Sequence, residues 1–338
     1  MKICLFCFSD AGAKLAEKLC TLLGVEKARV HTVEKFAVPY GFTAHRKISE
    51  AMGALFAEND ALIFIGACGI AVREIAPHLA SKTTDPAVLV LDDRGRYVIP
   101  ILSGHIGGAG ALAKEVAKLL GAEAVVTTAT DGAGKFSCDA FAASHGFAIS
   151  SMATAKEVSA AILRRNIPIC AERALPKPLP QGLVRGGRGE IGVYIGVHTE
   201  TPFEKTLNLI PRALILGVGC RRGASGERLL SAVRAVLEEN SLDLRAVAAI
   251  ASIDRKADEP GLLWLAETLG VGTAFYTAEE LNALEGAFDD SAFVRSTVGT
   301  GNVCERAAVL CGGKLIVKKR AADGVTVAVS EKTWRIEF

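Results

Sequence analysis

Residues 97–131 constrain the fold more than any other stretch of this sequence. An apolar run, 97–102, is followed by the turn SGHIGG and by an Ala-, Leu-, Lys- and Glu-rich segment, 109–120, that ends at a glycine. A second apolar run, 124–129, then leads to Asp131. Such a composition favours a helix, and glycine commonly follows a helix end. The stretch therefore predicts a strand, glycine turn, helix and strand, with the turn at the carboxyl end of a parallel strand, where α/β sheets bind ligands.

The same pattern of strand, glycine turn and helix recurs along the chain. The other glycine turns are at residues 9–12, 66–69, 217–223 and 299–301. Each glycine can serve tight turn geometry alone, or it can let the backbone approach a ligand beside the free N–H groups of a helix N-terminus. Arg73, Arg221 and Arg222 lie in or beside these turns. Together, the five turns and these cations favour a large polyanionic ligand that spans domains.

The spacing of these units predicts an α/β fold with two lobes and mixed sheets. At 338 residues, two or three domains are expected from a prior of roughly 150 residues each. The predicted parts are an N-terminal lobe, 1–145, a small middle segment or linker, 146–210, and a C-terminal lobe, 211–338. Strands 87–91 and 96–101 are joined by a short turn and should be antiparallel, which makes the first sheet mixed. Residues 168–189, rich in proline and glycine, predict a loop or linker.

Composition and charge argue against several classes of partner. The formal net charge is +2, and aromatic residues make up 6% of the chain, so neither an electrostatic field nor base stacking favours nucleic acid. No apolar run reaches the roughly 18 residues of a membrane helix, and the first residues, MKICLFCFSD, lack the features of a signal peptide. We therefore expect a cytoplasmic protein without a nucleic-acid or membrane partner. Its nine cysteines lie within apolar segments, which favours packing over disulfide bonds. Cys4-x-x-Cys7 resembles a redox or metal-binding pair, but positions three apart in a strand point to opposite faces, so packing is favoured there too.

His105 is the most informative candidate for chemistry, because it is the only histidine in a glycine turn. The other histidines show no metal-ligand spacing. An acidic cluster, Asp254, Asp258 and Glu259, follows a predicted strand, where it can complement a helix dipole or take part in a site. The turn at 217–223 is near the dinucleotide fingerprint but carries an extra residue. Asp254 follows 31 residues after Gly223 rather than about 20, which disfavours NAD(P) binding.

Six stretches, in both halves of the chain, resemble one family. In the N-terminal half they are GACGIAVREIAPHL from Gly66, DPAVLVLDDRGRYVIPILSGHIGGAGALA from Asp85, and TTATD ending at Asp131; in the C-terminal half they are GVGCRRG from Gly217, SIDRKADEPGLLWLA from Ser252, and VGTGNVCERAA from Val298. In order and spacing these resemble the cobalt-precorrin-5A hydrolase family (CbiG-type) of anaerobic cobalamin biosynthesis. One departure is Gly110, where the family usually has Asn after GGA.

The resemblance implies hydrolysis of a cobalt-corrinoid lactone. Water opens the ring-A δ-lactone, and the C20 carbon leaves with its methyl group as acetaldehyde. The cobalt arrives in the substrate, so neither a cofactor nor a protein metal site is implied. A lactone hydrolase needs a general base and donors to the oxyanion, for which His105 and the backbone of its turn are suited. Asp131 is expected to orient the imidazole or the water, and Glu259 is a further catalytic candidate.

The substrate's acetate and propionate groups require anion sites. The predicted substrate-binding residues are Gly66, Gly69, Arg73, Ser103, Gly104, Gly107, Gly108, Gly217, Gly219, Arg221, Arg222, Asp254, Gly299 and Asn302. Transient contacts with neighbouring pathway enzymes are also expected. Two alternatives stay open at this point: a non-catalytic corrinoid-binding or scaffold protein, and an NADP-linked oxidoreductase.

Overall fold

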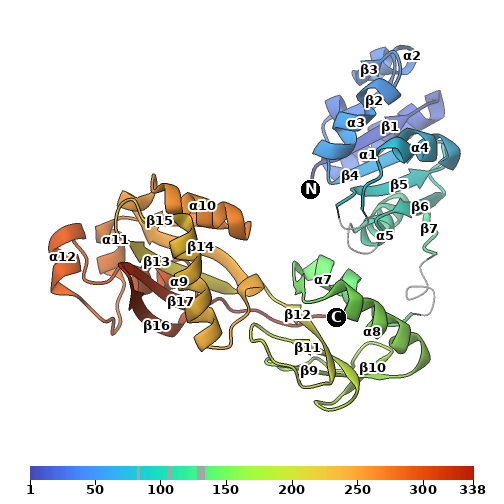
Figure 1. The fold of residues 1–338 in the computed structure, drawn as a ribbon. Coiled ribbons are helices and arrows are strands. Elements are labelled where there is room, and N and C mark those ends of the chain that lie inside the picture. Colours follow the sequence, from blue (N-terminus) through green and yellow to red (C-terminus); the bar gives the residue numbers. More distant parts are fainter. Residues whose placement is uncertain (82–83, 105–107, 128–133) are drawn as a thin grey trace. The chain divides into compact units, whose positions relative to one another are not determined.

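The computed structural model describes residues 1–81, 84–104, 108–127 and 134–338. His105, Gly107 and Asp131 lie outside the described residues. The chain divides into two compact units, Met1–His145 and Gly146–Phe338. The second unit contains two sheets, so the structure has three sheets in all among the described residues (Figure 1).

The N-terminal unit is built on a seven-stranded mixed sheet with the order β3-β2-β1-β4-β5-β6-β7. The strands are β1 Ile3–Cys7, β2 Val30–Val33, β3 Thr43–His45, β4 Ala61–Ile65, β5 Ala87–Leu91, β6 Tyr97–Leu102 and β7 Glu123–Ala124. The first five are parallel, β6 is antiparallel to β5, and β7 is parallel to β6. This confirms the mixed sheet. Of the predicted strand 124–129, residue 124 lies in β7 and residues 125–127 lie in no strand, while residues 128 and 129 are outside the described residues.

Helices cover both faces of this sheet. On one face α1 (Asp10–Leu23) and α5 (Ala109–Leu120) pack against one set of alternate strand residues, including Leu5, Ile63 and Leu89. On the other face α3 (Ser49–Glu58) and α4 (Cys68–Ile75) pack against the residues between them. Strands buried on both faces explain the continuous apolar runs of β1, β4 and β5. The unit also contains α2 (Glu34–Ala37) and α7 (Cys138–His145).

Residues 146–210 form a five-stranded sheet of their own, with the order β10-β9-β11-β12-β8. The strands are β8 Ala148–Ile149, β9 Ile167–Ala171, β10 Leu183–Arg185, β11 Ile191–Ile195 and β12 Lys205–Ile210. Helix α8 (Met152–Arg164) packs on this sheet and is capped by Ser151, whose Oγ accepts from the Thr154 N–H. The loop predicted over 168–189 is therefore wrong in part, because β10 and all but the first residue of β9 lie within it. Apolar residues at alternate positions, such as Ile167 and Ile169, are buried there despite the prolines.

The C-terminal sheet has the order β15-β14-β13-β17-β16. Its strands are β13 Leu214–Cys220, β14 Val247–Ile253, β15 Gly272–Tyr276, β16 Lys314–Ala322 and β17 Val325–Glu331. The first three are parallel, and β16 and β17 form a closing antiparallel hairpin. The surrounding helices are α9 Gly226–Glu239 and α10 Pro260–Leu269 on one face, α11 Ala278–Ala283 and α13 Cys304–Leu310 on the other, and α12 Ala292–Val298. In the part of the chain that the structure describes, no helix is long and apolar enough to cross a membrane.

Candidate functional site

The carboxyl edge of the N-terminal sheet has the geometry of a ligand site. The strand order reverses between β1 and β4, because β2 and β3 extend the sheet on one side and β5 on the other. Open α/β sheets bind ligands at the carboxyl ends of the strands that flank such a reversal. The predicted turns that begin at Ser9 and Gly66 directly follow β1 and β4, so both lie at this point.

Asp93 lies between these two turns. It belongs to the loop after β5, and its Oδ2 accepts a hydrogen bond of 2.7 Å from the Ser9 hydroxyl, which also accepts from the Gly12 N–H at 3.0 Å. A Cβ atom on Gly12 or Gly66 would lie 3.5 or 3.9 Å from Asp93 Oδ1. This Oδ1 is buried without a hydrogen-bond partner among the described residues. Three loops therefore converge on one carboxylate with an unused acceptor.

Helix α4 starts at the same edge and carries a free cation. Gly69 is in its first turn, and the nearest group to a Cβ there would be the Arg73 guanidinium, at 3.7 Å. Arg73 is exposed, and within the described ranges no hydrogen bond or ion pair engages its side chain. Gly66 has φ +151°, a conformation that only glycine adopts readily. The open turn and the cation suit a carboxylate ligand.

Ser103 and Gly104, which follow β6, lie at the opposite edge of the main sheet. Because β6 is antiparallel to β5, its last residue, Leu102, pairs with Val88 near the start of β5. The Ser103 hydroxyl donates to the Asp85 carbonyl oxygen at 2.8 Å, which anchors the turn there. A five-residue strand of about 16 Å therefore separates the Gly66 and Ser103 turns. The two turns therefore do not belong to one site at one edge of the sheet, although their similar sequences suggest that they do.

The described part of this turn supports the start of α5. The Ala109 and Gly110 N–H groups donate to the carbonyl oxygens of Ser103 and Gly104, at 3.1 and 2.9 Å. These two amides are therefore not available to an oxyanion. Gly110 is also tightly placed, because a Cβ there would lie 2.9 Å from the Gly104 oxygen. Gly108 has φ +79° and is the N-cap of α5.

At the carboxyl edge of the C-terminal sheet, Glu259 is buried, with 1% of its surface exposed. Its Oε1 accepts from the Gly223 N–H at 2.7 Å and its Oε2 from Lys256 Nζ at 2.8 Å. Burial alone would raise its pKa, but the Lys256 and Gly223 hydrogen bonds and the charges of Lys256 and Arg222 together lower it. Glu259 is thus held ionised and fixes the glycine turn after β13.

The two arginines of that turn differ. Arg222 Nη1 lies 3.4 Å from Asp258 Oδ2, and its Nη2 donates to the Arg255 carbonyl oxygen at 3.1 Å. The exposed Arg221 guanidinium has neither a hydrogen bond nor an ion pair among the residues described. Asp254, directly after β14, accepts from the Arg255 N–H at 2.7 Å. Arg221 is therefore the cation of this edge that remains available to an anion.

Several predicted glycine positions in this sheet are filled by the protein itself. A Cβ on Gly217 would overlap the Cys304 carbonyl oxygen of α13, and one on Gly219 would lie 2.5 Å from Thr326 Oγ1. Gly299 has φ +84° and ends α12. Asn302 is 1% exposed; its Oδ1 accepts from the Glu305 N–H at 3.0 Å and its Nδ2 donates to Glu305 Oε2 at 2.9 Å. Gly217 thus lets α13 pack closely on β13, Gly219 lies against β17, and Asn302 holds the start of α13.

The sequence interpretation missed a polar cluster at the carboxyl edge of the middle sheet, where the strand order reverses between β9 and β11. Glu172 Oε1 accepts from Tyr194 Oη at 2.9 Å, from the His198 N–H at 2.9 Å, and from His198 Nδ1 at 2.7 Å. Burial would raise the Glu172 pKa, but the His198 and Tyr194 bonds lower it; burial and Glu172 raise that of Tyr194. No local motif links these three residues, so only the fold reveals them.

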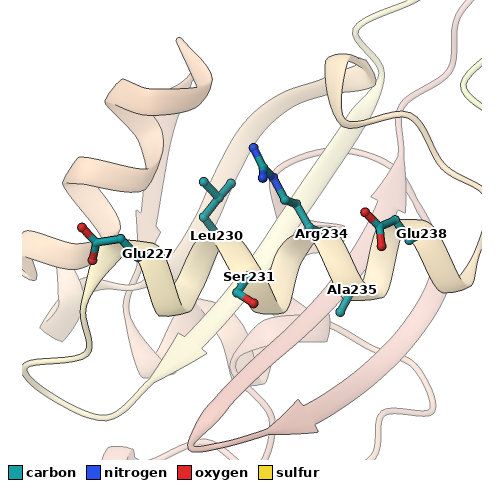
Figure 2. Close-up of a pocket in the computed structure, with 6 residues that line it drawn as sticks. All are labelled: Glu227, Leu230, Ser231, Arg234, Ala235 and Glu238. Carbon is teal, nitrogen blue, oxygen red and sulfur yellow. The ribbon is translucent and has the colours of Figure 1, made fainter.

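Two hollows in the surface of the second unit are large enough to consider as sites. A shallow groove of about 460 Å³ runs along the outer face of α9, where Arg234 lies between Glu227 and Glu238 (Figure 2). A cavity of about 830 Å³ is lined by Arg173 and Ala174 after β9, by the start of β16, and by residues 331–337. Over the described ranges, no group of three or more His, Cys, Asp or Glu side chains could hold a metal ion.

Comparisons with known proteins define the class and then the family. The family model for the cobalamin synthesis G N-terminal region matches residues 50–131, and that for its C-terminus matches residues 214–330. The chain is 35% identical to the cobalt-precorrin-5A hydrolase of Salmonella typhimurium, over 97% of both chains. It is 32% identical to that of Priestia megaterium, over 82% of this chain and 80% of the relative. The chain therefore belongs to the cobalt-precorrin-5A hydrolase family.

A solved structure also matches along the chain. It is a cobalamin biosynthesis protein G homolog from Sulfolobus solfataricus, with 23% identity and a TM-score of 0.41. The match covers 98% of this chain and 97% of that chain.

Proposed function

We propose that this chain is a cobalt-precorrin-5A hydrolase, which opens the ring-A δ-lactone with water and releases C20 with its methyl group as acetaldehyde. The observation that carries the proposal is the 35% identity to a cobalt-precorrin-5A hydrolase over 97% of both chains. The open carboxyl edge of the N-terminal sheet supports it, since a substrate with several carboxylates requires free cations and accessible backbone.

The proposed chemistry begins with proton transfer from water. A histidine changes charge near neutral pH, so His105 can take the proton from water and return it to the leaving alkoxide. Asp131 orients the imidazole or the water, and N–H groups of the 103–108 turn stabilise the oxyanion. The Ser103 and Gly104 carbonyls hold the first turn of α5 in place beside it. Asp254 and Glu259 are the alternative proton carriers, but Glu259 would first have to give up its bond to Gly223 or Lys256.

The proposed substrate contacts follow from which groups are free. Arg73 and Arg221 bind substrate carboxylates, with backbone approach at the turns of Gly66, Gly69, Gly107 and Gly108. Arg222, Asp254 and Gly299 shape the edge around Arg221. Gly217, Gly219 and Asn302 act by packing, because protein atoms fill the space beside them. The cobalt is part of the substrate, so the reaction requires no further cofactor. We also propose that the reaction takes place in the cytoplasm.

Acetaldehyde release from cobalt-precorrin-5A tests this function. The purified protein should form acetaldehyde and the ring-contracted corrinoid in equal amounts, without added nicotinamide cofactor. A spectral shift of the corrinoid without acetaldehyde would instead identify a binding or scaffold protein. Dependence of the product on NADP would favour the oxidoreductase alternative.

A further inference from the structure

The cavity of about 830 Å³ in the second unit carries an excess of positive charge. Arg173, Lys314, Lys332 and Arg335 line it, against the carboxylates of Glu331 and Glu337. Glu331 Oε1 is already engaged, because it accepts from Arg173 Nη2 and from Trp334 Nε1, each at 2.7 Å. The cavity therefore holds more cations than its own carboxylates neutralise.

Three of these cations are unpaired within the described part of the chain. Among the described residues, the side chains of Lys314, Lys332 and Arg335 have no hydrogen bond and no ion pair. Like charges gathered in one hollow repel each other, and the free energy of this arrangement improves when an anion binds between them. The ligand should therefore carry two or more negative groups.

The cavity also offers an apolar surface. Ile316 is 39% exposed, and the ring of Trp334 lies in the lining with the Arg173 guanidinium 5.4 Å from its centroid. The segment after β17 runs towards the middle sheet (Figure 1). It is held there because Trp334 packs edge-on against Phe147, just before β8, with 6.4 Å between the ring centroids. A volume of this size lies within the range of about 300–1,000 Å³ typical of cofactor and small-molecule sites.

We propose that this cavity binds the carboxylate-bearing edge of the corrinoid substrate, an inference that rests on the proposed function. Lys314, Lys332 and Arg335 bind acetate or propionate side chains, and Ile316 and Trp334 contact the apolar macrocycle. The groove on α9 does not fit such a ligand, since Glu227 and Glu238 flank its single cation, Arg234 (Figure 2). The cavity is a second substrate-binding region, separate from the glycine turns.

Two stable corrinoids test this recognition on the unmodified protein. Cobyrinic acid carries free carboxylates, whereas cobinamide has the same macrocycle with amides in their place. Equilibrium dialysis should show binding of cobyrinic acid at least about tenfold tighter than of cobinamide, and weaker as salt rises. Equal binding of the two would overturn charge recognition, whatever any variant does.

Charge removal then places the site. K314Q, K332Q and R335Q should each weaken cobyrinic acid binding roughly fivefold, and the triple variant about a hundredfold. A matched control removes three exposed cations elsewhere in the second unit: K156Q, R228Q and R234Q. The control should bind as the wild type does. Binding by the cavity triple within twofold of wild type would overturn the proposal.

The kinetic readout separates this inference from the proposed function. With cobalt-precorrin-5A, the cavity triple should raise KM with turnover within about twofold, which is the pattern of lost uniform binding. If the wild type releases no acetaldehyde but binds cobyrinic acid through these cations, the function fails and the site stands. If the wild type releases acetaldehyde and the triple retains its KM, the site fails and the function stands.

Discussion

The carboxyl edges of the N-terminal and C-terminal sheets share a sequence pattern but differ in what fills their glycine turns. At the N-terminal edge, the nearest group to a Cβ on Gly69 would be a flexible arginine at 3.7 Å, and Asp93 Oδ1 has no partner among the described residues. At the C-terminal edge, the backbone of α13 occupies the space beside Gly217. A strand followed by a glycine turn thus predicts a close approach, but not whether a ligand or the protein makes it.

The charged side chains of the two edges differ in the same way, apart from Arg221, which is unpaired among the described residues at the C-terminal edge too. Glu259 is satisfied by Gly223 and Lys256, and the Arg222 guanidinium lies against Asp258. Arg73 in the N-terminal unit has no such partner within the described chain.

The largest expected effect is on catalysis in the N-terminal unit. His105→Ala should lower turnover on cobalt-precorrin-5A by about 10²–10⁴, because general acid–base catalysis is typically worth that factor. Corrinoid binding and the melting temperature should stay close to wild type. Acetaldehyde release measured in single turnovers, beside a spectral titration, provides the test.

Full activity of His105→Ala would move the chemistry away from this turn and towards Asp254 and Glu259. Loss of corrinoid binding would assign His105 to substrate binding. His78→Gln is a suitable control, since His78 packs against Phe56 in the same unit and is outside every proposed site.

The second prediction concerns packing at the filled turn. Gly217→Ala should destabilise the second unit by about 3 kcal/mol or more, because a methyl group must displace the start of α13. Both tryptophans, Trp264 and Trp334, are in this unit, so tryptophan fluorescence during urea unfolding reports on it alone. Gly187→Ala, with open space around its Cβ, should change the midpoint little. A midpoint for Gly217→Ala close to that control would show that the turn has room after all.

Local sequence patterns predicted strand pairing within the sheets, but not which turns lie together at one edge. The antiparallel pairing of β5 and β6 follows from the short turn between them. That the Ser103 turn lies opposite Gly66 depends on the place of β5 in the sheet, which no local signal gives. The prolines of 168–189 hid β9 and β10, because pairing with β11 and packing by α8 decided their structure.

Site residues were predictable only where a turn carries them. Gly66 and Arg73 follow a strand end directly, and the structure places both at the strand-order reversal. Asp93 is in the turn after β5, and its link to Ser9 spans 84 positions. The Glu172–His198 pair spans 26 positions and joins two strand ends. Such contacts depend on strand order, so sequence periodicity could not reveal them.

A third prediction contrasts the acid sensitivity of the units. Burial, together with the charges of His45 and Arg29, lowers the pKa of His31 to about 4. An unfolded histidine has a pKa near 6.5, so the unfolded chain binds the proton first. The stabilising contribution of neutral His31 is therefore fully present above about pH 6.5. It is lost as pH falls towards 4, which lowers the free energy of unfolding by up to about 3 kcal/mol.

Unfolding followed at several pH values by far-ultraviolet circular dichroism measures this loss, and tryptophan fluorescence isolates the second unit. The free energy of unfolding of the N-terminal unit should fall between about pH 6.5 and 4, while that of the second unit should stay nearly constant. His31→Gln should flatten the dependence. The same slope in wild type and variant would place the titrating group elsewhere.

The fourth prediction concerns the paired carboxylate of the C-terminal edge. Glu259→Gln should cost about 1–2 kcal/mol, because Lys256 loses its charged partner while the amide oxygen can still accept from Gly223. The Glu259 pKa is lowered in the fold, so its contribution is present above an unfolded pKa of about 4.3 and is lost as pH falls below it. The stability difference between wild type and variant should therefore shrink in acid. A difference independent of pH would mean that charge plays no part.

The smallest stability effect is expected at the open turn. Gly69→Ala should leave the free energy of unfolding within about 1 kcal/mol of wild type, on the stabilising side, because alanine favours the first turn of α4 and its Cβ meets only Arg73 at 3.7 Å. The same methyl group lies beside the free guanidinium, where it would hinder a substrate carboxylate. We therefore expect a KM for cobalt-precorrin-5A raised severalfold with turnover preserved. Paired with Gly217→Ala, this variant separates the two kinds of turn: one should lose stability, and the other affinity. A strongly destabilised Gly69→Ala variant would mean that protein atoms fill the N-terminal turn too. If KM and stability were both unchanged, the turn would have space but would not bind the substrate.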